Sequence, residues 1–219
     1  MTHHGIVGKA AVILVLGVIA AACAARGAEP VAAAKSQSLF DGTSLQGWKK
    51  TAFGGEGDVD VDDGKIVMRA GNPLTGITWT GDHPRMDYEI SLDAMRVDGS
   101  DFFCGLTFPV GDAPCTFVVG GWGGGVIGLS SIDGSDASEN ETTRYQEFTS
   151  GKWHQVRVRV TQDKIEAWLD GKQMADVETK DRRISIRPEV ELSRPLGVSC
   201  FSTTAALRNI KIETLAKTK

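Results

Sequence analysis

A polar, acidic segment near the middle of the chain holds side chains that are well suited to proton transfer. Residues 133–144 contain no apolar residue larger than alanine. Glu139 and Glu141 could act as general base and general acid, or could supply oxygen ligands to a divalent cation. Arg144 could receive negative charge that develops on a substrate oxygen. Polar loops of this length are typical of functional loops on a rigid scaffold, and the alternative is a solvated loop without a chemical role.

Two other residues qualify as candidates by their type and setting. His154 opens an alternating segment and is, with His83, one of two histidines after residue 38. Its imidazole could serve as a lone base, and the alternative is a histidine on the surface of a sheet. Trp122 lies within a run of glycines, residues 120–125. Neighbours without side chains would leave its ring free to stack on a sugar; alternatively, a glycine-rich bulge packs the ring inward.

Other kinds of site find less support in the sequence. Glu189 and Glu191 would share one face of an expected strand with carboxylates about 7 Å apart, a spacing that suits an inverting glycosidase. Such pairs normally come from different strands, so we do not assign this one. No zinc-ligand spacing and no serine-nucleophile motif occurs. The net charge of −4 disfavours nucleic acid as a partner.

Alternating apolar and polar residues predict that strands position these side chains. In residues 87–94, Tyr88, Ile90 and Leu92 share one face, and in residues 155–160 valines alternate with arginines. Asp-Gly turns separate these segments from others of the same kind. No helical stripe occurs, so we expect an all-β sandwich or jelly roll of two antiparallel sheets rather than a barrel. The other expected strands are 59–61, 65–69, 76–80, 101–108, 116–119, 126–130, 164–169, 172–177, 185–187, 197–201 and 206–213.

The N-terminal residues have the pattern of an export signal. Lys9 precedes an apolar run, residues 10–22, that is short for a membrane span but typical of a signal peptide. The run ends in three alanines before Cys23, as in bacterial lipoproteins. We predict a signal peptide at 1–22, a flexible tether at 23–38 and one domain at 39–219. The protein would be exported to the periplasm or the outer cell surface. A lipid at Cys23, ordinary cleavage and an uncleaved anchor remain alternatives.

Three cysteines follow the leader, and spacing argues against the obvious disulfide. A hairpin that turns at residues 111–113 places Phe108 opposite Cys115. Cys104 then lies about 13 Å further along, which is too far for a bond. We therefore expect Cys104, Cys115 and Cys200 to be buried free thiols.

Several motifs occur in order along the chain, at residues 38–48, 62–67, 78–90, 151–154, 164–171 and 206–212. Taken together, they resemble the 3-keto-disaccharide hydrolase domain family. They extend from about residue 38 to residue 214. The resemblance implies a concanavalin A-like fold and a carbohydrate partner. It also implies chemistry on sugars oxidised at carbon 3, by hydrolysis or by elimination across carbons 1 and 2 followed by hydration.

The chain also departs from the family pattern. Residues 198–204 lack the usual His-Gly, and Pro109 replaces an arginine at the end of the segment that begins at Asp101. Asp101, Trp122 and the outward-facing Arg157 are the predicted sugar-binding residues. Glu139, Glu141, Arg144 and His154 are the catalytic candidates. Trp48, Trp153 and Trp168 are expected to anchor the core. An enzyme acting on 3-keto-glycosides and a non-catalytic carbohydrate-binding module both remain open.

Overall fold

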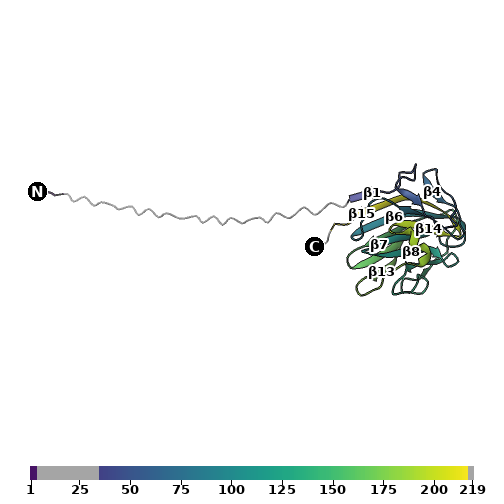
Figure 1. The fold of residues 1–219 in the computed structure, drawn as a ribbon. Helices are drawn as coiled ribbons and strands as arrows, with labels where there is room; N and C mark the ends of the chain where they lie inside the picture. Colours follow the sequence, from purple (N-terminus) through teal and green to yellow (C-terminus); the bar gives the residue numbers. More distant parts are fainter. Residues whose placement is uncertain (4–34, 217–219) are drawn as a thin grey trace. The chain divides into compact units, whose positions relative to one another are not determined.

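A computed structural model describes residues 1–3 and 35–216 of the chain. Residues 35–216 form two antiparallel sheets (Figure 1), as the sequence predicted. Residues 4–34, which hold the apolar run of the predicted signal peptide and most of the predicted tether, lie outside the described residues. Among the residues described, no helix is long and apolar enough to cross a membrane.

The first sheet has eight strands, and its centre is the long strand β6 between β11 and β15. Every neighbouring pair is antiparallel. Residues 35–38, which we expected to end the tether, instead form β1 and pair with β15. The strand order is β13 (Lys172–Glu178), β12 (Lys164–Leu169), β11 (Trp153–Val160), β6 (Tyr88–Gly99), β15 (Thr203–Thr214), β4 (Lys65–Met68) and β3 (Val59–Asp62), with β1 (Lys35–Ser38) beside β15.

The second sheet has seven strands, and its outer face carries many small residues. Gly76, Ser199 and Gly105 align across three neighbouring strands. The short 3-10 helix η1 (Pro188–Ser193) packs on this face so closely that a Cβ at Gly197 would lie 2.5 Å from the Ser193 oxygen. The strand order is β10 (Arg144–Tyr145), β9 (Val126–Ser130), β8 (Ala113–Gly121), β7 (Cys104–Val110), β14 (Gly197–Phe201), β5 (Leu74–Trp79) and β2 (Trp48–Lys50).

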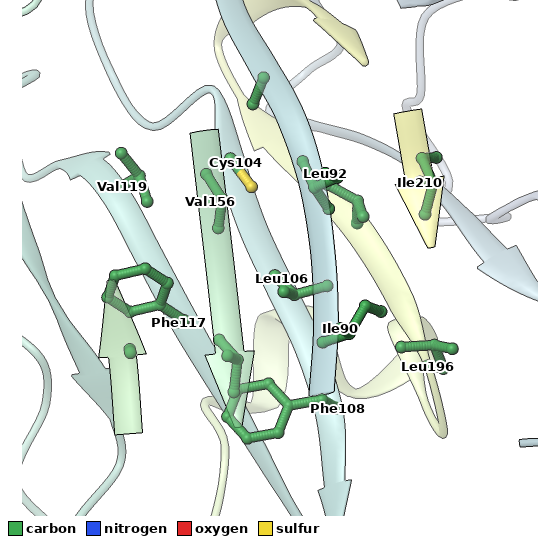
Figure 2. Close-up of a cluster of buried hydrophobic side chains, with 14 of the residues drawn as sticks. Ile90, Leu92, Cys104, Leu106, Phe108, Phe117, Val119, Val156, Leu196 and Ile210 are labelled. Atoms are coloured by element: carbon green, nitrogen blue, oxygen red, sulfur yellow. The ribbon is translucent and has the colours of Figure 1, made fainter. Parts of the chain in front are cut away.

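The core lies between the inner faces of the two sheets. Figure 2 shows Ile90 and Leu92 of β6 close to Leu106, Phe108 and other apolar side chains of the core. These four side chains are at most 1% exposed. Burial of this apolar area is the main source of stability for the sandwich.

The hairpin register and the thiols confirm the sequence interpretation. Phe108 pairs with Cys115, and Cys104 pairs with Val119. Cys104, Cys115 and Cys200 are free and buried. Burial away from water raises the pKa of each of these thiols to about 12.

Two expectations about local structure were wrong. Residues 185–187 form no strand, although neighbouring Ile184 makes a single bridge to Ile132. Glu189 and Glu191 lie in η1, which Pro188 begins, so they do not share the face of a strand.

The three tryptophans expected in the core separate into two groups. Trp48 is buried, and its indole N–H donates to the Leu39 oxygen at 2.7 Å. Trp153 and Trp168 are only half-buried. An arginine stacks on each, with Arg208 4.1 Å from the Trp153 ring centre and Arg157 3.7 Å from that of Trp168. Because alternate residues of a strand face opposite sides, both rings lie on the outer face of the eight-stranded sheet.

Candidate functional site

A pocket of about 200 Å³ lies on the outer face of the seven-stranded sheet. Thr116 and Val118 form part of its floor, because the residues that alternate with them on β8 point into the core. Its volume suits a small ligand rather than an extended chain. The apolar lining residues are Leu74, Phe102, Val118, Val190 and Phe201, and the others are Asp101, Thr116, Trp122, Ser130, Arg187 and Glu189.

Trp122 borders this pocket from the turn between β8 and β9. The turn is tight, since both Gly124 N–H and Gly125 N–H donate to the Gly121 oxygen at 3.1 Å. Trp122 has a φ of 49°, and its side chain remains 43% exposed. An exposed indole at the rim of a pocket offers a flat apolar face against which a sugar ring can stack.

Asp101 lies next to Trp122 because the turn holds its carboxylate. Oδ2 accepts a hydrogen bond from Gly123 N–H at 3.0 Å, and Oδ1 accepts one from Phe102 N–H at 2.7 Å. The two acceptor oxygens are thereby fixed at the pocket wall, where they can also accept bonds from ligand hydroxyl groups. The structure therefore brings two predicted sugar-binding residues, Asp101 and Trp122, to one pocket.

Arg187 supplies a cation to the same pocket. Its Nε and Nη2 donate to Glu189 Oε1 at 2.8 and 2.6 Å, and its Nη1 contacts Asp136. These bonds, the one to Glu189 above all, raise the pKa of the Arg187 guanidinium. The guanidinium carbon lies 5.9 Å from the centre of the Trp122 ring. A permanent positive charge therefore lies beside the Trp122 ring, paired with the carboxylates of Glu189 and Asp136.

Sequence reasoning missed Arg187, and it considered Glu189 only as half of a carboxylate pair with Glu191 that was not assigned. Arg187 was expected at the end of a strand, where its direction is set by alternation alone. The available signal was charge: residues 182–194 contain four arginines, and the acidic segment 133–144 lacked an assigned counter-charge. Asp136 in that segment is in fact the partner of Arg187.

The predicted catalytic carboxylates lie elsewhere on the acidic loop. Glu141 is bonded to Arg182 Nη2 at 2.5 Å, and this bond lowers the pKa of the Glu141 carboxyl. Glu139 is exposed, and Arg144 donates to the main-chain oxygens of Glu141 and Thr143. Of the described residues that line the pocket, none is Glu139, Glu141 or Arg144.

His154 and Arg157 belong to the other sheet. His154 points from β11 into the sandwich, is 2% exposed and bonds Asp170 Oδ2 through Nδ1 at 2.8 Å. Arg157 lies on the outer face of that sheet and bonds Glu89 at 2.9 Å. The seven predicted site residues therefore occupy four separate regions: the pocket, the acidic loop, the interior of the sandwich and the outer face of the eight-stranded sheet. Of the seven, only Asp101 and Trp122 line the pocket.

The described residues also offer no donor set suited to the alternative of a divalent cation. Within residues 1–3 and 35–216, no three His, Cys, Asp or Glu side chains are grouped closely enough to hold a metal ion. Glu141, one of the two proposed ligands, is instead paired with Arg182.

Solved structures of other proteins share this fold at low sequence identity. A proposed glycosyl hydrolase from Parabacteroides distasonis is 15% identical with a TM-score of 0.54, covering 82% of this chain and 94% of that one. Carbohydrate-binding module CBM66 from Bacillus subtilis is 14% identical with a TM-score of 0.50, covering 75% and 94%. Domain 4 of AbnA, a GH43 extracellular arabinanase from Geobacillus stearothermophilus solved with arabinotriose, is 13% identical with a TM-score of 0.53, covering 84% and 92%.

Sequence comparison gives the family. No curated protein sequence matches the chain. The family model described as the 3-keto-alpha-glucoside-1,2-lyase-like domain matches residues 35–213, which begin at β1 and end one residue before the end of β15. This chain is therefore a member of the 3-keto-alpha-glucoside-1,2-lyase-like domain family.

Proposed function

We propose that this protein cleaves a glycoside whose sugar carries a carbonyl group at carbon 3, by elimination across carbons 1 and 2. The observation that carries the proposal is one pocket lined by an exposed indole, a guanidinium and two carboxylates: Trp122, Arg187, Asp101 and Glu189. Membership of a lyase-like family supports the same reaction class. Neighbours in fold that include a carbohydrate-binding module support a sugar as the ligand.

The oxidised sugar would bind with its apolar face on Trp122. Asp101 would accept hydrogen bonds from its hydroxyl groups, since both carboxylate oxygens are held at the pocket wall. Apolar neighbours such as Phe102 and Val118 would exclude water from one side of the ring. Exclusion of water strengthens every charge interaction in the pocket.

The carbonyl at carbon 3 makes the hydrogen on carbon 2 acidic, because the resulting carbanion is an enolate. Arg187 would stabilise the negative charge on the enolate oxygen. Glu189 would remove the proton; both Arg187 bonds end on its Oε1, so we assign proton abstraction to Oε2. The electron pair from the C2–H bond becomes the C1=C2 double bond as the C1–O bond breaks. The departing oxygen takes a proton from water, and the hydroxide so formed recovers the proton held by Glu189. Addition of water across the double bond would then give the free 3-keto sugar.

A chromogenic 3-keto-glucoside tests this assignment. We expect release of its aglycone by the purified full chain, and a slower reaction when carbon 2 carries deuterium. Glu189→Gln should lower kcat at least about 100-fold, the usual scale for loss of a general base. Glu191→Gln is the matched control, because Glu191 lies on the same helix but bonds Arg194 at 2.5 Å. An unchanged rate for Glu189→Gln would overturn the assigned base.

Binding of a glycan without turnover is the second candidate. It is favoured by the pairing already present in the pocket: Arg187 bonds two carboxylates, and both oxygens of Asp101 accept main-chain N–H bonds. Polar groups paired in this way can hold a sugar without being free to exchange protons. Saturable binding of a 3-keto-glucoside with no release of its aglycone would support this candidate over the enzyme.

We also propose that the chain is exported and carries a lipid on Cys23. Support comes from the apolar run at residues 10–22 and the three alanines before the cysteine. Incorporation of labelled fatty acid into the full chain in a bacterial host, and its loss in Cys23→Ser, is the expected result. Release of unlabelled protein into the periplasm would favour ordinary cleavage.

A further inference from the structure

Arg96 extends from β6 of one sheet to the turn of the other sheet that carries Trp122. Tyr88, Ile90, Leu92 and Ala94 alternate along the inner face of β6, and Arg96 is the next residue in this series. It is 6% exposed. A charged side chain at an inward position is costly unless its hydrogen bonds are satisfied, so its partners indicate why it is there.

Among the described residues, every hydrogen-bond partner of the guanidinium is a main-chain oxygen, three of them in loops and one, that of Gly120, near the end of β8. Nη2 donates to Asp101 and Gly124 at 3.0 Å each and to Gly120 at 3.4 Å. Nη1 donates to Phe148 at 3.4 Å. Within residues 35–216, no carboxylate forms an ion pair with it. One buried cation therefore ties together the loop of Asp101 and both ends of the Trp122 turn.

The glycines around Trp122 make room for this guanidinium. A Cβ at Gly120 would lie 2.7 Å from Arg96 Nη2, well inside normal contact distance. A Cβ at Gly124 would lie 3.4 Å from the same nitrogen, and Gly124 has a φ of 108°. The rings of Phe103 and Phe148 pack around the cation, with centres 5.3 and 5.8 Å from its central carbon.

We infer that Arg96 is a positioning residue that fixes Trp122 and Asp101 at the pocket. It does not itself line the pocket and acts through the main chain of residues 120–124 and of Asp101. Its value for sugar recognition rests on the proposed function. Its control of the Trp122 turn does not depend on that function, so the two roles can be measured separately.

Fluorine NMR of the full chain labelled with 5-fluorotryptophan reports on the turn without any ligand. The chain has five tryptophans, and Trp122→Phe identifies the resonance of Trp122. Arg96→Lys keeps the charge but loses the planar fork, so we expect the Trp122 resonance to shift or broaden. Arg208→Lys is the matched control, because Arg208 bonds Asp93 and stacks on Trp153 on the outer face of the other sheet. It should move the Trp153 resonance instead.

A second variant leaves the arginine at position 96 unsubstituted. Gly120→Ala should displace the guanidinium and reproduce the change at Trp122, and it also covers the case in which Arg96→Lys fails to fold. An unmoved Trp122 resonance in a folded variant of either kind would overturn the inference.

A 3-keto-glucoside then tests the consequence for recognition. We expect Arg96→Lys to raise KM or Kd at least about tenfold, with a smaller effect on kcat, because ring placement is disturbed while Arg187 and Glu189 remain. An unchanged KM or Kd despite a shifted Trp122 resonance would refute the link to recognition. If the unmodified chain neither binds nor cleaves the sugar, the proposed function fails, and the resonance of Trp122 still decides the positioning role.

Discussion

Arg182 Nη2 lies 2.5 Å from Glu141 Oε1, and Nε of the same guanidinium lies 2.5 Å from Asp133 Oδ2. This arrangement attaches the acidic loop to the segment that leads to Arg187. The hydrogen bond from the Arg183 N–H lowers the pKa of the Asp133 carboxyl most, and the bond from Arg182 lowers it further. Arg182 also lowers the pKa of the Glu141 carboxyl. The charges of the loop thus hold it in place.

Acid should therefore loosen this loop. A carboxyl whose pKa is lower in the folded chain stabilises it above the unfolded pKa of about 4, and the stabilisation is lost as pH falls through the folded value. We predict that Arg182→Gln lowers Tm at pH 7 and weakens the dependence of Tm on pH below about 4. Circular dichroism melts across this range measure it. Arg144→Gln is the control. If Arg182→Gln and Arg144→Gln showed the same dependence of Tm on pH, the role of the pairs that Arg182 forms with Asp133 and Glu141 would be contradicted.

Substitution of Phe117 tests how closely the core between the two sheets is packed. Its side chain is fully buried on the inner face of β8. We predict that Phe117→Ala lowers the free energy of unfolding by about 3–5 kcal/mol, since it leaves a cavity. Val97→Ala, at a 41% exposed position near the end of β6, should cost less than about 1 kcal/mol. Urea denaturation compares them, and similar losses in the two variants would mean that Phe117 is not packed as described.

Alanine substitutions at Gly47 and Gly42 distinguish the cost of backbone strain from the cost of a steric clash. Both have positive φ, 82° and 81°. A Cβ at Gly47 would lie 2.4 Å from the Trp79 ring, whereas a Cβ at Gly42 would meet no atom within 4 Å. Gly42→Ala should cost about 1 kcal/mol of unfolding free energy, and Gly47→Ala about 1–3 kcal/mol more. Equal losses in the same denaturation assay would remove the steric argument.

The buried thiols should be inert in the folded protein. Burial raises the pKa of Cys104, Cys115 and Cys200 to about 12, so almost no thiolate forms at pH 8. In a Cys23→Ser chain, a chromogenic disulfide reagent should give no signal at pH 8 until denaturant is added, and then three equivalents. Rapid reaction before unfolding would indicate that a thiol is accessible.

Much of the fold could be predicted from sequence, because the alternation of apolar and polar residues indicates which side of each strand is buried. The strands at Val126–Ser130, Lys164–Leu169 and Gly197–Phe201 have the predicted bounds. β1 was missed because all four of its residues are exposed and leave no apolar pattern. The core role given to Trp153 and Trp168 was wrong, because stacked arginines can cover an aromatic ring on an outer face.

The site could be predicted only in part, because it is assembled from distant segments. Asp101 and Trp122 were found from their local sequence, one at the start of an expected strand and the other among glycines. Arg187 reaches the pocket through an irregular segment before η1, whose path no periodicity encodes. Arg96 was within reach, since alternation continued past Ala94 would have placed an arginine on the inner face of β6.

Binding of a 3-keto-glucoside by two tryptophan variants tests the location of the site most directly. Isothermal titration of folded Trp122→Ala should give a Kd at least about fivefold weaker than that of the unmodified chain, because the stacking surface is lost. Trp168→Ala, which removes a ring on the far sheet, should bind as the unmodified chain does. Unchanged affinity in Trp122→Ala, or a loss confined to Trp168→Ala, would contradict the assignment of this pocket.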